Sequence, residues 1–442
     1  MFGAIIRFFD RMVQRFLPDA FIFAIILTLI VFVLGIFMTD SSTVDMVNYW
    51  GVGFWDLLAF TMQMALIVIT GYILASSKIM ANLMSRLALL AHTPGQAIVL
   101  VTLVASIACL INYGFGLVIG ALFAKHVVKQ VPTVDYRILV ASAYSGFLVW
   151  HGGFSASIPL TIATDNHFLF DTIGSIPVTQ TLLSPYNLFI VITLVATLPI
   201  VNYLSSRAIK EKTIIDPAFL NLDKNSEEAA TEEKANTPAE KMENSQVLSL
   251  LIGILGLAFI VYHFASNGFD LNINIVNFIM LFLGILFHRT PRRFLKSVTD
   301  GVKNAGGVII QFPFYAGIMG MMVESGLSAQ IAEWFVHFST EATFPLLTFI
   351  SAGIINFFVP SGGGQWAVQG PIMIPAAIEL GADTAKVAMA VAWGDAWTNM
   401  IQPFWALPAL AIAGLKVRDI MGFCLVILFW AFIPISIGFI FF

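Results

Sequence analysis

The chain has 442 residues and the composition of a membrane protein. Of these residues 58% are hydrophobic, and only 22 are Lys or Arg and 26 Asp or Glu. Fifteen of the charges fall in one segment, Arg207–Glu243, which excludes a soluble fold for the rest. The net charge is −4 and the basic residues are scattered, so no nucleic-acid partner is expected. Cys109 and Cys424 lie in apolar runs, which predicts neither a disulfide framework nor a metal site.

Runs with little or no charge recur along the whole chain. Two of them are too long for one crossing of about 20 residues and too short for two, so each predicts a re-entrant hairpin. The other nine predict transmembrane helices, which makes the fold an all-α polytopic membrane protein in contact with the lipid bilayer. The hairpin runs are Ala97–Ala124 and Phe344–Ile378, and the crossings are Ala20–Met38, Leu57–Leu74, Ile138–Thr164, Leu182–Ser206, Val247–Phe264, Leu271–Phe287, Asn304–Val323, Val387–Leu415 and Ile420–Phe442.

The basic residues indicate the orientation. A cytoplasmic N-terminus puts 21 of the 22 Lys and Arg on the cytoplasmic side and leaves only Lys386 outside. Basic residues accumulate in the cytoplasmic loops of membrane proteins, and the opposite orientation would reverse this division. We therefore predict a cytoplasmic N-terminus and an external C-terminus.

Two halves of the chain match weakly at a nearly constant spacing. Gly53, Asn112 and Pro159 are followed 248, 244 and 249 residues later by Gly301, Asn356 and Pro408. The consistent order indicates a repeat. The extra helix at 247–264 adds one crossing, so the second copy starts from the opposite side of the membrane. We expect two inverted-topology repeats, 1–206 and a second within 247–442, joined by an acidic cytoplasmic linker at 207–246. In such proteins the substrate and ion sites lie between the repeats near the bilayer midplane.

Each half also contains a run that glycine and polar residues interrupt, 138–164 in the first and 387–415 in the second. Non-helical backbone at membrane depth is tolerated only where it is buried in protein or lines a cavity. Paired breaks in two repeats therefore point to a transport site. The alternative is that Gly and Pro only permit close helix packing here, but polar residues at the same breaks favour the site.

The predicted membrane interior holds no Lys or Arg. An anionic substrate would then be bound by helix N-termini, which carry partial positive charge and free N–H groups. Three successive glycines in the second hairpin would let backbone amides approach a carboxylate closely. The predicted substrate-binding residues are Asn112, Tyr113, Gly114, Ser361, Gly362, Gly363, Gly364, Gln365 and Asn399.

Asp395 is the only acidic residue in 387–415. A carboxylate inside a membrane costs about 2.5–3.5 kcal/mol on insertion and indicates function by default. We expect it to carry H⁺ or to ligate Na⁺, the alternative being a structural acid satisfied by Trp397 or by backbone donors. His151 is either a proton relay or a hydrogen-bonded packing residue, and Thr398 is a third coupling-ion candidate. No cofactor other than the coupling ion is expected.

Long strings spread over the chain carry a resemblance to a known family. They are Phe16-Leu-Pro-Asp, Trp55-Asp-Leu-Leu-Ala-Phe-Thr-Met-Gln-Met-Ala, Ile111-Asn-Tyr-Gly-Phe-Gly-Leu, Val359-Pro-Ser-Gly-Gly-Gly-Gln-Trp and Gln402-Pro-Phe-Trp-Ala-Leu-Pro-Ala-Leu-Ala-Ile-Ala-Gly. Through them the chain resembles the bacterial short-chain fatty acid transporters, inner-membrane carriers associated with acetoacetate and butyrate use. The resemblance implies a short-chain monocarboxylate as substrate and the bacterial inner membrane as location.

More distantly, the layout resembles the ion transporter superfamily of elevator carriers. These are dimers in which a scaffold domain supports a moving domain with two hairpins, so the resemblance implies a homodimer. Sodium symporters of that superfamily have Ser-Asn-Thr at the hairpin tips, whereas this chain has Asn112-Tyr-Gly and Ser361-Gly-Gly. This departure speaks against sodium coupling.

Two rival functions follow from these observations. The first is symport of short-chain monocarboxylates, and the second is export or exchange of larger organic anions. An intramembrane enzyme is disfavoured because no Ser-His or metal-ligand constellation is visible. A primary pump is excluded for this chain alone because it lacks a Gly-x-x-x-x-Gly-Lys-Ser/Thr loop.

Overall fold

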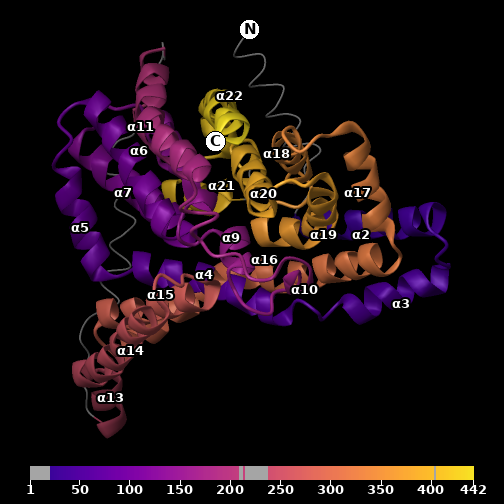
Figure 1. Ribbon diagram of the computed structural model, residues 1–442. Coiled ribbons are helices and arrows are strands. Elements are labelled where there is room, and N and C mark those ends of the chain that lie inside the picture. Colours follow the sequence, from indigo (N-terminus) through magenta and orange to yellow (C-terminus); the bar gives the residue numbers. More distant parts are fainter. Residues whose placement is uncertain (1–19, 209–212, 215–236, 403–404) are drawn as a thin grey trace.

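The computed structural model describes residues 20–208, 213–214, 237–402 and 405–442. Every regular element in this part is helical, which agrees with the predicted class (Figure 1). Most of the predicted linker, 207–246, lies outside the described residues. The elements are α2 (Ala20–Met38), α3 (Thr43–Gly53), α4 (Leu58–Ala75), α5 (Lys78–Ala88), α6 (Pro94–Ile111), α7 (Tyr113–Gln130), α8 (Tyr136–Ser145), the 3-10 helix η1 (Gly146–Gly152), α9 (Ser157–Ile162), α10 (Phe170–Ile173), α11 (Pro185–Arg207), α13 (Pro238–Glu243), α14 (Gln246–Asn267), α15 (Ile273–His288), α16 (Pro291–Glu324), α17 (Leu327–Phe338), α18 (Phe344–Ile355), α19 (Gly362–Leu380), α20 (Thr384–Thr398), α21 (Ala406–Ala413) and α22 (Val417–Phe441).

Seven helices in the described part are long and apolar enough to cross a membrane: α2, α4, α6, α11, α14, α16 and α22. All of them except α6 coincide with predicted crossings. A further predicted crossing corresponds to α15, which is apolar but has 16 residues. The lengths and apolar character of these helices support a multi-pass membrane protein.

Local signals explain where several long helices begin. Helices α6, α11 and α16 each start at proline, directly after a Thr or Ser whose side chain accepts a hydrogen bond from the backbone of the first turn. Such an N-cap with proline at the first helical position is a strong start signal. For α16 this start, Pro291, lies well before the predicted Asn304, because the helix continues through a charged segment that hydropathy alone does not include.

Five helices outside the apolar runs were not predicted from the sequence: α3, α5, α10, α13 and α17. They are short or contain polar and charged residues, so a search for long uncharged runs passes over them. Helix α3 begins at a capping box in which Ser42 and Asp45 bond each other's backbone N–H, a signal that was readable in the sequence.

Each of the two over-long runs contains two helices and a break. Helix α6 ends and α7 begins at Asn112, and residues 356–361 join α18 to α19. Both runs that glycine and polar residues interrupt are also divided. The first is divided into α8, η1 and α9, and the second into α20 and α21.

The helices form two groups. Figure 1 shows α3, α4, α14, α15 and α16 along the lower edge, with α6, α7, α11, α20 and α22 above them. Within these groups α4 packs on α16, and α18 packs on α20. The second helix of each two-helix run connects the groups, since α7 contacts α4 and α19 contacts α16.

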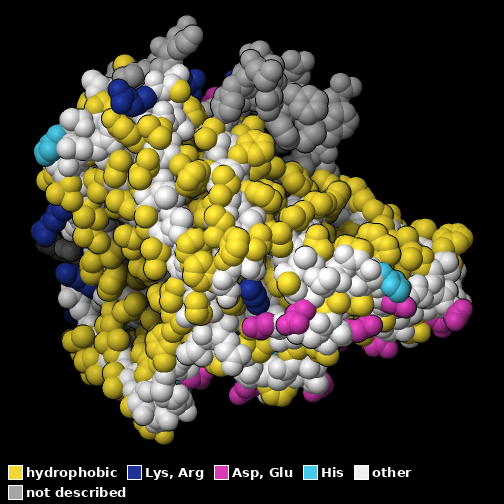
Figure 2. Space-filling view, turned by 45° about the horizontal axis from the view of Figure 1, so that its top comes forward, with side chains coloured by type: hydrophobic (Ala, Val, Ile, Leu, Met, Phe, Trp, Pro, Cys, Tyr) yellow, Lys and Arg dark blue, Asp and Glu magenta, His cyan; other side chains and the backbone are white. Residues whose placement is uncertain are grey.

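The surface is that of a protein embedded in lipid. Figure 2 shows a broad hydrophobic face, with acidic side chains along its lower right and bottom and most of the visible Lys and Arg at the upper left and left edge. Helices α2 and α14 are the least covered of the seven long apolar helices, each with 17% of its apolar window buried. Exposed apolar area of this size is stable only against lipid or another apolar surface.

Candidate functional site

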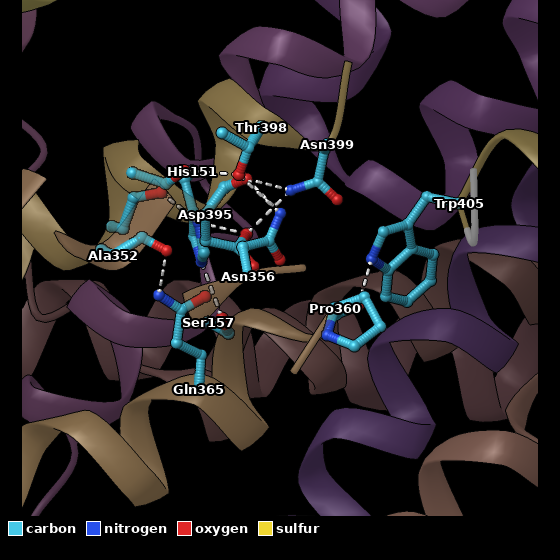
Figure 3. Close-up of polar contacts among 12 residues, drawn as sticks. His151, Ser157, Ala352, Asn356, Pro360, Gln365, Asp395, Thr398, Asn399 and Trp405 are labelled. Atoms are coloured by element: carbon cyan, nitrogen blue, oxygen red, sulfur yellow. Dashed lines mark hydrogen bonds and ion pairs between the residues drawn. The ribbon is translucent and has the colours of Figure 1, made fainter. Parts of the chain in front are cut away.

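The two breaks of the second half meet the break of the first half at one buried cluster (Figure 3). His151 of η1 and Asp395 of α20 lie together there, both with 0% of their surface exposed. Nδ1 of His151 is 3.1 Å from Oδ2 of Asp395 and 2.7 Å from the carbonyl of Ala392. The structure therefore pairs two residues that the sequence singled out separately.

These contacts define the protonation of the His151 ring. Nδ1 faces a backbone carbonyl, which only accepts hydrogen bonds, so Nδ1 carries a hydrogen. Nε2 lies 2.8 Å from Oγ of Ser157. In the neutral ring, Nε2 accepts the hydroxyl hydrogen of Ser157, and in the charged ring it donates to that oxygen. His151 can thus change its charge without losing a partner.

The glycine segment of α19 packs directly on this histidine. A Cβ atom on Gly362 would lie 2.6 Å from Nε2 of His151 and 2.7 Å from Oγ of Ser157, so only glycine fits. Ser361 precedes the helix and is 7% exposed, but its side chain does not cap the first turn. The first N–H groups of α19 therefore have no side-chain cap from Ser361.

The next two glycines face away from His151. A Cβ on Gly363 would meet Phe60 of α4 at 2.9 Å, and one on Gly364 would meet Tyr315 of α16 at 2.6 Å. They let α19 approach these helices closely, while their backbone N–H groups still belong to its positive end. The glycine run thus permits close packing of α19 on His151, α4 and α16.

Amide side chains hold the break after α20 against the end of α18. Asn356 donates from Nδ2 to the carbonyl of Asp395 at 3.1 Å and to Oγ1 of Thr398 at 3.0 Å. Asn399 donates from Nδ2 to Oδ2 of Asp395 at 3.1 Å, and Thr398 donates to the carbonyl of Gly353 at 2.9 Å. The predicted residues Thr398 and Asn399 therefore lie beside Asp395.

Gln365 closes the cluster from the first turn of α19. Its Nε2 donates to the carbonyl of Ala352 at 2.9 Å and to Oε1 of Gln369 at 3.0 Å. Gln365, Asn356 and Asn399 are all 0% exposed. In this conformation the cluster is closed to solvent.

The tip of the first two-helix run is arranged differently. Asn112 accepts from the backbone N–H of Phe115 at 2.8 Å, and Ser155 accepts from that of Tyr113 at 2.8 Å. Gly114 packs on α4, where a Cβ would lie 3.3 Å from Cα of Val68. The N-terminus of α7 is thus capped by side chains, whereas that of α19 is not.

Aromatic rings connect the two tips. Tyr113 contacts Trp150 with ring centroids 4.7 Å apart, and Trp150 stacks on His151 at 3.6 Å. Tyr113 also lies edge-on to Trp405 at 5.6 Å, and the indole of Trp405 donates to the carbonyl of Pro360 at 2.8 Å. All of the predicted site residues therefore belong to one region, although the first tip reaches the cluster only through these rings.

The predicted site residues left out three that build the site: Ser155, Ser157 and Asn356. Two of them had a readable signal, because Asn356 is the repeat partner of Asn112 and Ser155 follows Gly152 and Gly153 in the interrupted run. No local pattern marks Ser157. Among the described residues no group of three or more His, Cys, Asp or Glu side chains could hold a metal ion.

The comparison with known families decides the class of this protein. A family model described as short chain fatty acid transporter matches residues 1–442. The chain belongs to this family. It is a transporter rather than an enzyme, which confirms the resemblance and implies a small-molecule substrate and a membrane environment.

Two curated relatives of the transporter are named as candidate short-chain fatty acid transporters. The protein of Escherichia coli (strain K12) is 47% identical over 441 residues, which is 99% of both chains. The protein of Haemophilus influenzae (strain ATCC 51907 / DSM 11121 / KW20 / Rd) is 48% identical over 432 residues, which is 96% of both.

A solved structure shares the fold of the transporter. The crystal structure of the YdaH transporter of Alcanivorax borkumensis superimposes with a TM-score of 0.60, covering 95% of this chain and 98% of the other. The sequence identity is 17%, so this likeness concerns the fold alone.

Proposed function

We propose that the protein is a secondary active transporter of short-chain monocarboxylates such as acetoacetate and butyrate in the bacterial inner membrane, with its N-terminus in the cytoplasm. The observation that carries this proposal is the uncapped, glycine-built N-terminus of α19, which faces His151 and Ser157 beside Asp395. It combines an anion-binding feature and an ionisable pair in one closed cluster.

The carboxylate would bind at the first turn of α19. Among the described residues no Lys or Arg is buried, so backbone N–H groups and the helix dipole supply the attraction. The first-turn amides of Gly362 and its neighbours are within reach only because no side chain stands between them and the ligand. The tip of α7, whose amides are already capped, would shape the pocket through Tyr113 and Trp150.

Coupling would run through Asp395, with His151 and Thr398 as further candidates. Either H⁺ or Na⁺ at this carboxylate would neutralise a buried charge, and that change would accompany binding of the anionic substrate nearby. Asp395→Asn mimics the neutral acid. It is expected to retain exchange of labelled butyrate across proteoliposomes but to lose accumulation against a gradient. Accumulation equal to that of the parent protein would exclude coupling through Asp395.

The transport movement would be of the elevator type. The pairs α6/α7 and α18/α19, and the broken runs that follow them, support two inverted-topology repeats, with units at 1–206 and 247–442 joined through 207–246. Helices α4 and α16 each support the second helix of one hairpin. In this scheme α4, α16 and their neighbours form the scaffold of a homodimer, and the hairpins, α8 to α11 and α20 to α22 move.

Counterflow in proteoliposomes tests the substrate class. Vesicles preloaded with unlabelled butyrate should concentrate labelled butyrate or acetoacetate, whereas a larger aromatic carboxylate should compete poorly. The closed cluster leaves little room beside the Gly362–His151 contact, which is the physical reason for this size preference. Preferential exchange of the larger acid would instead favour the exporter or exchanger of larger organic anions.

A further inference from the structure

We propose that the loop between α9 and α11, residues 163–184, is a pH-sensitive clamp on helix α19, and that protonation of His167 releases it. In the proposed orientation this loop lies outside the cell, so the acidity of the external medium would control it. The consequence for transport rests on the proposed function, while the release itself can be tested without any substrate.

His167 holds the short helix α10 at both ends. Its Nδ1 accepts from the backbone N–H of Leu169 at 3.2 Å, just before the helix. Its Nε2 lies 2.9 Å from the carbonyl of Gly174, just after the helix. A backbone N–H only donates and a carbonyl only accepts. The two contacts together therefore require a neutral ring with its hydrogen on Nε2.

Helix α10 depends on these end contacts. It has only four residues, and a single turn gains too few internal hydrogen bonds to offset the cost of ordering its backbone. The residue before the histidine, Asn166, has a φ of 60°, a conformation that residues other than glycine seldom adopt. The imidazole ring thus supports a turn that the local sequence favours little.

The two residues after the histidine lie between α4 and α19. The ring centroid of Phe168 is 5.8 Å from that of Phe60 in α4. Leu169 is buried, and a Cβ on Gly370 of α19 would lie 2.9 Å from its Cδ1. Phe60 packs in turn on the first turn of α19, where a Cβ on Gly363 would lie 2.9 Å from its Cζ. The loop therefore supports α19 at two places, directly at Gly370 and through Phe60 at Gly363.

The two ends of this segment are attached without the histidine. The backbone N–H of Ile176 donates to the carbonyl of Ile162 at 2.7 Å. At the other end, Oγ1 of Thr164 accepts from the backbone N–H of Ile273, at the start of α15, at 3.2 Å. Neither contact contains a titratable group, so both should persist at any moderate pH. Protonation of His167 should therefore loosen only residues 165–174.

Protonation would break one of the two contacts that the ring makes. A second hydrogen, on Nδ1, would face the N–H of Leu169, and two donors cannot bond each other. The contact with the carbonyl of Gly174 would remain, because Nε2 keeps its hydrogen. The lost bond belongs to Leu169, whose side chain lies on α19, so the contact with Gly370 should weaken first.

The surroundings of the ring set the sign of the pH dependence. The neighbouring helices contribute uncharged residues to the loop, namely Phe60, Gly370 and Ile273. Among the described residues, Asp165 is the charged group that raises the pKa of His167, but partial burial has the larger effect and lowers it. The released loop thus binds a proton more readily than the closed loop does. The closed form is favoured above about pH 6.5 and becomes less stable as the pH falls below that value.

Hydrogen–deuterium exchange of the purified protein in detergent, without substrate, tests the clamp. Protection factors, corrected for the intrinsic effect of pH on exchange, are compared at about pH 7.5 and about pH 5.5, on either side of the ordinary pKa of histidine. Residues 165–174 should lose protection about 2- to 12-fold at the lower pH, the factor that corresponds to one hydrogen bond, and the first turns of α19 should lose it with them. Equal protection at the two pH values would overturn the proposal.

Substitutions then identify the sensor. His167→Asn places an amide oxygen where it can still accept from the N–H of Leu169, and His167→Gln retains an N–H donor for Gly174, but neither side chain titrates. Protection of residues 165–174 should become independent of pH in both variants. Should one of them fail to fold, the other still decides. A pH dependence equal to that of the parent protein would assign the effect to another group and overturn the proposal.

His263→Gln is the matched control. His263 precedes another loop, between α14 and α15, and its Nε2 also contacts a backbone carbonyl, that of Asp270 at 2.9 Å. The contacts described for residues 165–174 do not include it, so this variant should keep the pH dependence of the parent protein. Loss of that dependence in His263→Gln would overturn the assignment to His167.

Butyrate counterflow separates this proposal from the proposed function. Counterflow together with protection that does not change with pH would refute the clamp and leave the substrate proposal standing. A loss of protection that requires His167, without movement of butyrate, would refute the substrate proposal and support the clamp.

Discussion

Gly362→Ala should separate folding from transport, because the added methyl group would enter the narrow space between α19 and His151. The new Cβ would lie 2.6 Å from Nε2 of His151 and 2.7 Å from Oγ of Ser157. Real Cβ atoms are not found that close to other heavy atoms, so the hairpin tip or the histidine must shift by several tenths of an ångström. Either movement displaces the first-turn N–H groups of α19 from the proposed carboxylate position.

The two effects differ in size. Overpacking a buried site costs about 1–3 kcal/mol, and alanine in place of a helical glycine returns about 0.5–1 kcal/mol. The net loss of stability, about 0–2.5 kcal/mol, is small beside the 5–15 kcal/mol typical of a folded domain. Hydrogen bonds to a charged ligand are worth about 1.5–3 kcal/mol, so losing one should weaken butyrate binding about 10- to 150-fold.

The assay is the KM for butyrate counterflow in proteoliposomes, with the unfolding midpoint in detergent measured in parallel. Gly306→Ala in α16 is the matched control, because a Cβ there would meet nothing within 4 Å. It should leave both quantities close to those of the parent protein. A normal KM for Gly362→Ala would refute the assignment of the carboxylate to the first turn of α19.

Two further predictions concern the tip of the second hairpin, between α18 and α19, and the orientation of the chain in the membrane. Trp405→Phe keeps an aromatic ring beside Tyr113 but removes the hydrogen bond to Pro360, worth about 0.5–1.5 kcal/mol. Its unfolding midpoint should fall slightly and its KM for butyrate should rise; an unchanged KM would show that the tip does not depend on this bond. Single cysteines at Asp45 and Asn267 should react with an impermeant maleimide from outside the cell, and one at Asn225 should not, because Asn225 lies in the predicted cytoplasmic linker. The native Cys109 and Cys424 are buried, so they should add little background labelling. External labelling at Asn225 would reverse the orientation.

Much of the architecture could be predicted because it depends on local properties. Apolar run length marked the helices, and the over-long runs are divided at Asn112 and between Asn356 and Ser361. The glycines 362–364, which we expected to form the loop of the second hairpin, instead begin helix α19. The missed helices show the limit of this reading. Helix α3 is short and contains Asp45 and Asn48, and α16 extends through charged residues from Pro291, so hydropathy does not set their starts, which lie at capping residues.

The sequence by itself determined that this is an all-helical membrane protein with paired breaks, and that Asp395, His151 and the three glycines are unusual at such depth. These conclusions follow from the cost of charge and open backbone in lipid, which each residue carries wherever it lies. Only the tertiary structure decided that His151 contacts Asp395, that Gly362 packs on both His151 and Ser157, and that Asn356 and Asn399 both donate to the carbonyl of Asp395. Those facts depend on how helices from distant parts of the chain pack together, because the partner of a buried side chain is set by its neighbours in the folded protein and not by the local sequence.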